Sequence, residues 1–238
     1  MKPPRMSRPL RCVAWACVFA ASVWAGSAWA GAQVEEPLAN AVRTALSAAV
    51  NKAAPPEPVF ADEAQREQFE AWISAAEQRL VKRHDQELIR RDLLQTIWYE
   101  AKRAGLDPTM VLGLIEVESG FRQHAISSAG ARGLMQVMPF WARTIGGGDA
   151  SVLFHRQTNI RFGCVILRHY LDIEKGNVYM ALGRYNGSRG RAEYPNAVTA
   201  AWRRWQSVTA QARAPEAPAT QGSTRVAQAG QAQPMRAR

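Results

Sequence analysis

Apolar residues recur at spacings of three and four along the middle of the chain, which predicts amphipathic helices. Two such series follow Asp62. The first is Phe69, Trp72, Ile73, Ala76 and Leu80, and the second is Leu88, Leu93, Leu94, Ile97 and Trp98. Gly105 ends the second helix. Asp107-Pro108 then suits an N-cap and a first-turn proline of a helix that runs to about Ser119.

The same pattern predicts further helices at residues 136–145, 157–172, 177–184 and 193–205, separated by turns that contain glycine. Patterns that alternate as strands do are scarce. We therefore expect an all-α (mainly α) fold, with one domain over residues 62–206.

Residues 1–30 have the pattern of a secretory signal peptide. Four basic residues precede a long apolar run, and Ala28-Trp29-Ala30 suits cleavage before Gly31. An uncleaved membrane anchor is an alternative, because the apolar run is near spanning length. Lipid attachment at Cys17 is a weaker alternative, because the apolar run continues past that residue.

Two segments flank the predicted domain. Residues 31–61 hold an Ala-rich stretch, 31–54, that can form a weakly amphipathic helix, followed by a linker at Pro55-Pro56-Glu57-Pro58. Residues 207–238 form a basic tail rich in Ala, Gln and Pro, which we expect to be disordered. The tail is either a solvated segment or one held against an anionic surface.

Charge and cysteine content narrow the class of protein. The formal net charge of +10 falls to +6 once the four basic residues of the signal peptide are removed. An export signal and dispersed basic residues argue against nucleic-acid binding, and an anionic wall polymer explains the charge as well. The mature chain keeps only Cys164, which excludes an intrachain disulfide and suits a packing role in an apolar helix.

Glu116 and Glu118 are the candidate catalytic acids. Residues two apart on a helix point about 200° away from each other, so the two glutamates lie on nearly opposite faces. Glu118 shares its face with Val111, Leu114 and Ile115. A buried carboxyl either keeps its proton, as a general acid does, or pairs with an arginine such as Arg132 or Arg143. Glu116 is expected to face water or form a salt bridge.

The loop that follows Glu118 is rich in small residues, which permit close backbone approach to a ligand. Gln136, expected at the start of the next helix, offers a donor and an acceptor for sugar hydroxyls. Met135 offers an adaptable apolar wall. Alternatively, Leu134 and Met135 are core residues and Gln136 lies on the surface.

Residues 90–205 resemble the soluble lytic transglycosylase (SLT) catalytic domain, a lysozyme-like fold. The resemblance rests on motifs in the family's order. They are Glu118-Ser119-Gly120-Phe121, Ala131-Arg132-Gly133-Leu134-Met135-Gln136 with Met138-Pro139, Asn159-Ile160 with Gly163, Tyr185-Asn186-Gly187, and Tyr194 with Val198. One departure is Arg184, where the family usually has alanine. We expect this arginine to reach the substrate groove or to point to solvent.

The resemblance implies cleavage of the β-1,4 bond between N-acetylmuramic acid and N-acetylglucosamine in peptidoglycan, with a 1,6-anhydromuramic product. Glu118 would be the catalytic residue, acting first as acid and then as base. Tyr185 would lie near Glu118, where its hydroxyl could bond the carboxyl or the sugar. The residues implied to bind substrate are Ser119, Met135, Gln136, Tyr185, Asn186 and Tyr194.

The remaining acids and histidines add no second catalytic group. Hydrolytic glycosidases usually need two carboxyl groups, and none of Asp149, Asp172, Glu174 and Glu193 belongs to a matched motif. Glu193 is expected at the rim of the site. The histidines, His84, His124, His155 and His169, lack the pairing of metal ligands, so no cofactor or metal is predicted.

Two other functions stay open at this stage. One is a hydrolase of the goose-type lysozyme kind, and the other is a non-catalytic wall-binding component of a secretion or conjugation machine. The expected location is the periplasm of a Gram-negative-type bacterium, with membrane contact at most peripheral. The expected partners are peptidoglycan glycan strands. An envelope secretion, conjugation or pilus assembly is a further candidate partner, which residues 31–61 or the tail would contact.

Overall fold

The structure, a computed structural model, describes residue 33, residues 35–51 and residues 59–213. Within these ranges it holds helices and isolated bridges but no strand, which confirms the predicted all-α class. The elements are α1 (Asn40–Asn51), α2 (Glu63–Leu80), α3 (Glu87–Arg103), α4 (Pro108–Glu118), α5 (Pro139–Ile145), the 3₁₀ helix η1 (Ala150–Phe154), α6 (Arg156–Ile173), α7 (Val178–Asn186) and α8 (Glu193–Arg213). The expected signal peptide, the Pro55–Pro58 linker and residues 214–238 of the tail lie outside the described residues.

Aspartates cap the starts of α2 and α4, and Asp107 is the predicted cap of α4. The carboxylate of Asp62 accepts a hydrogen bond from the backbone N–H of Gln65, and that of Asp107 accepts one from Thr109 at 2.8 Å. Pro108 then occupies the first turn of α4, which confirms the predicted start of this helix.

Three helix boundaries differ from the prediction, each for a local reason. Helix α1 begins only at Asn40, after Pro37, which disfavours helix at the residue before it. Helix α5 begins at Pro139 rather than residue 136, because Met138 before the proline is extended. Helix α8 runs on to Arg213, into the segment assigned to the tail, since Ala, Gln and Arg favour helix.

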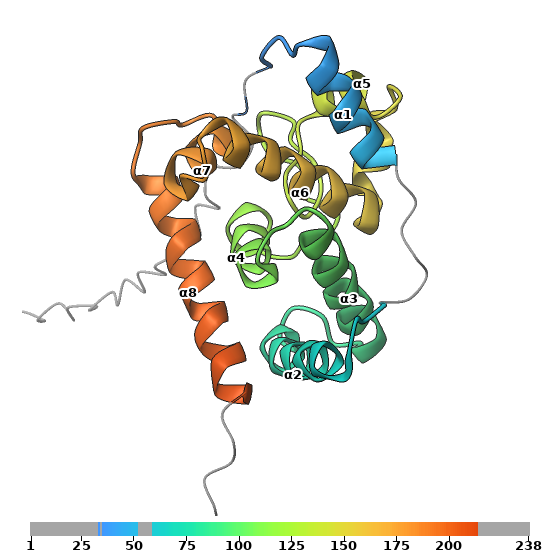
Figure 1. The fold of residues 1–238 in the computed structure, drawn as a ribbon, viewed down its shortest axis with the longest axis vertical. Coiled ribbons are helices and arrows are strands. Elements are labelled where there is room, and N and C mark those ends of the chain that lie inside the picture. Colours follow the sequence, from blue (N-terminus) through green and yellow to red (C-terminus); the bar gives the residue numbers. More distant parts are fainter. Residues whose placement is uncertain (1–32, 34, 52–58, 214–238) are drawn as a thin grey trace, which may run out of the picture.

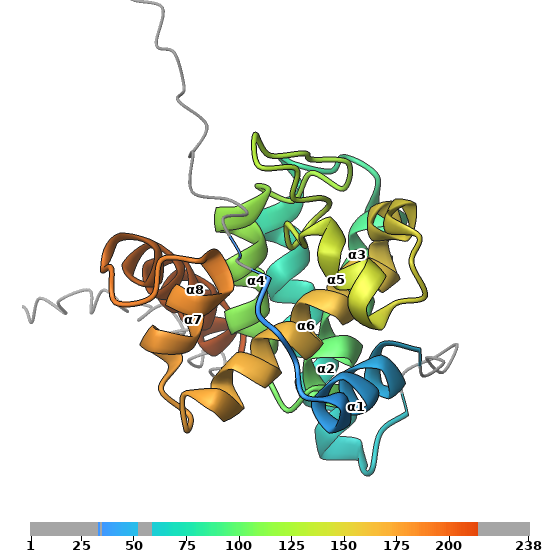
Figure 2. The ribbon, with the colours of Figure 1, turned by 90° about the horizontal axis from the view of Figure 1, so that it is seen from above.

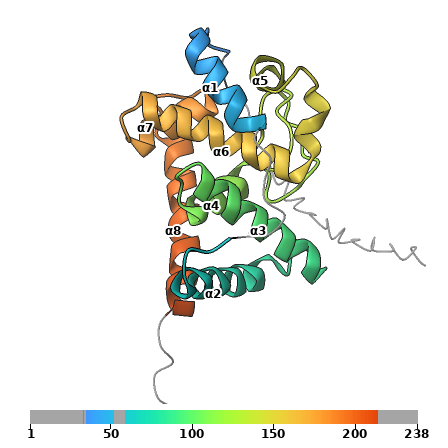
Figure 3. The ribbon, with the colours of Figure 1, turned by 45° about the vertical axis from the view of Figure 1, so that its right-hand side comes forward.

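Helix α4 lies at the centre of the bundle. Every residue from Pro108 to Ile115 is buried, as expected of a helix that is apolar all round. The other helices surround α4, with α8 running alongside it and α2 crossing near the far end of α8 (Figures 1 and 3). Helices α4 and α8 pack closely at Gly113 of α4, where an added Cβ would lie 2.6 Å from the backbone nitrogen of Trp202 in α8.

Helix α1 packs on this bundle through a buried ion network. Leu46 and Val50 of α1 join the hydrophobic core. Glu100 of α3 is fully buried, and its carboxylate pairs with Arg103 at 2.9 Å and Arg161 at 3.0 Å. The same two guanidinium groups donate to carbonyl oxygens in the last turn of α1, at Ala49 and Val50. Cations at this end of a helix are favourable, so the network fixes α1 against α3 and α6. None of the described helices meets the length and apolarity needed to cross a bilayer.

Candidate active site

The carboxyl group of Glu118, at the last residue of α4, is buried. Its Oε1 accepts a hydrogen bond from the hydroxyl of Tyr194, which α8 supplies. Its Oε2 is buried and has no hydrogen-bond partner among the described residues. Burial raises the pKa of this carboxyl from 4.5 to about 8, and the hydrogen bond from Tyr194 offsets part of the rise. Glu118 is therefore mostly protonated at pH 7.

The alternative in which an arginine neutralises Glu118 is wrong. The guanidinium of Arg132 donates instead to the carbonyl of Ala150, at 2.9 Å, and lies over the ring of Phe154. In the part of the chain that the structure describes, no arginine forms an ion pair with Glu118. The carboxyl of Glu118 is hydrogen-bonded to a phenol and not paired with a cation. Its ionised form therefore remains costly to bury, which favours the protonated form.

Glu116 behaves as an ordinary structural acid, as predicted. Its carboxylate pairs with Arg204 at 3.0 Å and accepts from the indole N–H of Trp205 at 2.7 Å. Glu116 thus binds α4 to α8, at residues of α8 well separated from Tyr194.

The loop between α4 and α5 is fixed by side chains from three directions. The hydroxyl of Ser119 donates to the carbonyl of Leu134 at 2.7 Å, and the hydroxyl of Tyr185 donates to that of Met135 at 2.8 Å. The side chain of Asn159, in α6, accepts from the N–H of Met135 at 2.8 Å. Its amide nitrogen donates to the carbonyls of Arg132 and Leu153, both at 2.8 Å. These bonds satisfy backbone groups that the irregular loop leaves buried.

Two glycines permit this close packing. Gly133 has a φ of +78°, and an added Cβ there would lie 2.3 Å from the side-chain nitrogen of Asn159. At Gly163 in α6, an added Cβ would lie 2.4 Å from the sulfur of Met135. The Gly-Leu-Met-Gln step therefore brings the loop backbone onto α6.

Several predicted site residues lie differently from expectation. Gln136 is not at a helix start: its φ is +46°, and its side-chain nitrogen donates to the carbonyls of Gly133 and Ala125. Met135 is fully buried, as in the alternative in which it is a core residue. The hydroxyl of Tyr185 binds the loop at Met135 and not the carboxyl of Glu118, although burial, and after it Glu118, raises the pKa of this phenol.

Asn186, beside Tyr185, donates to the hydroxyl of Ser188 at 3.0 Å, while its Oδ1 is buried and has no partner among the described residues. Of the residues predicted to bind substrate, Tyr194 is the one whose hydrogen bond to the carboxyl of Glu118 is seen among the described residues. Ser119 and Tyr185 instead bond neighbouring carbonyls of the loop, those of Leu134 and Met135. Arg184 is partly exposed, and its guanidinium pairs with Glu174 and Glu36.

Residues 95–206 match the family described as Transglycosylase SLT domain. This stretch contains Glu118, Tyr194 and the whole loop that Asn159 holds. The chain therefore carries an SLT domain. The resemblance seen in the sequence motifs is confirmed.

Relatives of the SLT domain are found in phage and bacteria. The transglycosylase of Enterobacteria phage PRD1 is 35% identical over 100 residues, which cover 42% of this chain and 36% of that protein. The membrane-bound lytic murein transglycosylase C of Actinobacillus pleuropneumoniae (serotype 5b, strain L20) is 40% identical over 85 residues, covering 32% of this chain and 23% of that protein. This chain thus spans about a third or less of the length of these two relatives.

A solved structure, an inactive mutant of the lytic transglycosylase Slt from Pseudomonas aeruginosa, is 26% identical over 48% of this chain and 22% of that one. Its TM-score of 0.37 is too low to compare the two folds as wholes.

Sequence reasoning missed two supports of the SLT domain. Asn159 was assigned to a motif but not to the site, although a polar residue near the start of a largely apolar helix was a usable signal. Glu100 was not singled out at all. Its spacing of three from Arg103 hinted at an ion pair, but nothing local indicated Arg161 as its second partner.

Proposed function

We propose that this protein is a lytic transglycosylase. It cleaves the β-1,4 bond between N-acetylmuramic acid and N-acetylglucosamine in peptidoglycan and leaves a 1,6-anhydromuramic end. The SLT domain supports the reaction class. The observation that carries the assignment to Glu118 is its buried carboxyl, which has a pKa of about 8 and one oxygen without a partner among the described residues.

The two oxygens of this carboxyl suit different tasks. Oε1 is held by the hydroxyl of Tyr194, whose own pKa is raised well above 10 by burial and by Glu118, so Tyr194 remains a donor. The proton of Glu118 therefore belongs on Oε2. From there it can pass to the glycosidic oxygen as the bond to the anomeric carbon breaks.

The second half of the reaction gives the enzyme a new proton in place of the one that left with the sugar. After the leaving sugar departs, the muramic 6-hydroxyl closes on the anomeric carbon and loses its proton to the carboxylate of Glu118. One proton leaves Oε2 and one returns, so the enzyme ends as it began. The hydrogen bond from Tyr194 stabilises the carboxylate between the two transfers.

The positions of the other acidic residues favour this intramolecular route over hydrolysis, because none of those considered supplies a second catalytic carboxyl group. Hydrolytic glycosidases usually have a second carboxyl group about 5–9.5 Å from the first. Glu116 and Glu174 are held in ion pairs, Asp149 caps η1, and Glu193 is exposed. Within the described ranges, burial and Tyr194 are the influences on the pKa of Glu118, and no second carboxylate contributes.

Product analysis tests the proposal. Purified protein is incubated with sacculi, and the released fragments are identified by mass spectrometry. We expect 1,6-anhydromuramic ends from the wild type and from Glu116→Gln, and none from Glu118→Gln. The Glu116 variant is a matched control, because the same change is made two residues away on the other face. Reducing muramic ends would support the goose-type hydrolase. Equal clearing of wall suspensions by all three proteins would refute the assignment of catalysis to Glu118, and no clearing by any of them would support a wall-binding role without catalysis.

We also propose that the protein acts in the periplasm. The signal-peptide pattern of residues 1–30 supports this location, as does a relative named a membrane-bound lytic murein transglycosylase. Fractionation of cells that express the full chain tests it, since recovery in the cytoplasm at full length would contradict export. An envelope assembly that needs a gap in the wall remains a candidate partner.

A further inference from the structure

The described residues that precede α1, residue 33 and residues 35–39, form an N-terminal arm outside the SLT domain. The arm runs from α1 across α6 toward α7 (Figure 2). The base of the arm is fixed, because α1 is bound to the bundle by its apolar residues and by the network around Glu100.

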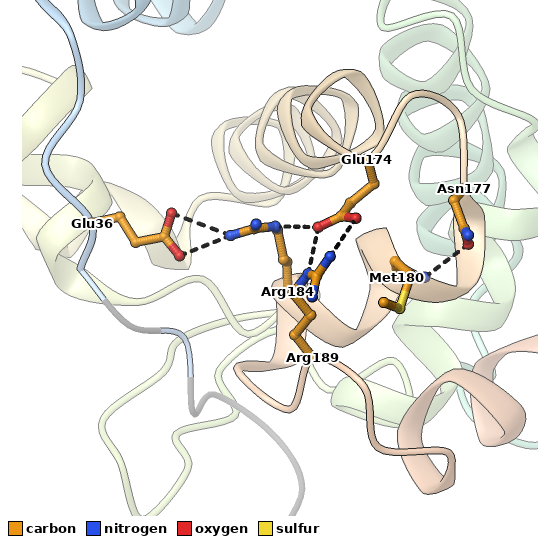
Figure 4. A network of polar contacts seen from close by, with 6 residues as sticks. All are labelled: Glu36, Glu174, Asn177, Met180, Arg184 and Arg189. Carbon is orange, nitrogen blue, oxygen red and sulfur yellow. Dashed lines mark hydrogen bonds and ion pairs between the residues drawn. The ribbon is translucent and has the colours of Figure 1, made fainter.

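The arm contacts α5, which follows the site loop, and α7, which carries Tyr185. The side-chain oxygen of Gln33 accepts a hydrogen bond from the indole N–H of Trp141, in α5, at 2.9 Å, and both side chains are buried. Glu36 pairs with Arg184, in α7, at 3.1 Å (Figure 4). Helix α5 directly follows the loop that Asn159 holds.

Arg184, in α7, connects the arm to Glu174 at the end of α6. Its Nη1 faces Glu36 and its Nε faces Glu174, at 2.5 Å, so one rigid guanidinium joins both acids (Figure 4). Glu174 also binds Arg189 in the loop after α7, and these two arginines hold the pKa of Glu174 near 2. Arg184 directly precedes Tyr185, whose hydroxyl binds the site loop at Met135.

We propose that Gln33 and Glu36 are positioning residues. The arm ties α5 to α7 and so fixes the spacing of the two helices between which the loop and Tyr185 meet. This inference rests on the proposed function, because it assigns the arm a role in holding the walls that bind a glycan strand. The Glu36–Arg184 pair is partly exposed. Because such an ion pair contributes only a small stabilising free energy, it can open and close reversibly.

The test compares Glu36→Gln with Glu35→Gln, the same change at the exposed neighbouring residue. On soluble glycan strands we expect Glu36→Gln to raise KM about two- to fivefold, the range that a partly exposed ion pair supplies. The kcat and its pH profile stay unchanged, because Glu118 and Tyr194 are untouched. Glu35→Gln behaves as the wild type. In about 1 M salt the difference between the wild type and Glu36→Gln shrinks, because the ion pair is screened.

Two further measurements separate positioning from stability. Hydrogen exchange of the free protein should be faster in α7 of Glu36→Gln than in the wild type. Adding Glu36→Gln to Arg184→Ala should raise KM no further than Arg184→Ala does alone. Equal KM values and equal exchange for the Glu35 and Glu36 variants would overturn the inference. So would a lower melting temperature with an unchanged KM, because the arm would then only stabilise the fold. A wild type without cleavage activity, but with the exchange response in α7, would overturn the proposed function and support the coupling of arm and helix.

Discussion

The buried carboxyl of Glu118 should make the stability of this protein depend on pH. Its pKa is about 8 in the folded state and 4.5 in the absence of burial. Between these values the native state keeps a proton that the unfolded chain has lost, so stability falls as pH rises from about 4.5 to 8. Below pH 4.5 both states are protonated and the cost vanishes.

The size of the effect follows from the two pKa values. Their difference, at about 1.4 kcal/mol for each pH unit, gives a cost of about 5 kcal/mol once the pH exceeds 8. The isosteric change Glu118→Gln removes this titration and keeps an acceptor for the hydroxyl of Tyr194. The buried amide of the glutamine also lacks a partner, but that cost does not vary with pH.

Urea denaturation of the wild type and Glu118→Gln at several values from pH 4 to pH 9 measures this effect. We expect the variant to gain about 4–5 kcal/mol of unfolding free energy relative to the wild type across that range. Taking the difference between the two proteins cancels all other titrating groups. A difference that stays constant from pH 4 to pH 9 would refute the argument, because Glu118 would then titrate alike in both states.

Three further substitutions probe the surrounding structure. Tyr194→Phe removes the hydrogen bond that lowers the pKa of Glu118, so the alkaline limb of the cleavage rate should move to higher pH; an unmoved limb would contradict that contact. Glu100→Gln leaves two largely buried arginines without their carboxylate, so it should lower the free energy of unfolding, measured by denaturation, by about 3–5 kcal/mol. A loss below about 1 kcal/mol is that of an exposed ion pair and would contradict the burial of this network. Gly113→Ala places a Cβ 2.6 Å from the backbone of Trp202 and should cost about 1–3 kcal/mol, and unchanged stability would show that the helices can separate freely.

The sequence by itself determined the central helix and the face on which Glu118 lies. Asp107, Pro108 and the run of apolar residues after them act through neighbours one to four positions away. Helical geometry then fixes which residues share a face, so the burial of Glu118 and its separation from Glu116 could be inferred without a structure. The motifs carried the family resemblance for a similar reason, because they are local in the chain.

Only the tertiary structure decided which groups meet Glu118. The hydroxyl that reaches it belongs to Tyr194, 76 positions away, and not to Tyr185, which holds the loop instead. Gln136 likewise faces inward, because Gly133 and the residue before Pro139 bend the backbone away from helix. Such contacts depend on how separate helices pack, and packing is set by the whole core rather than by spacing along the chain.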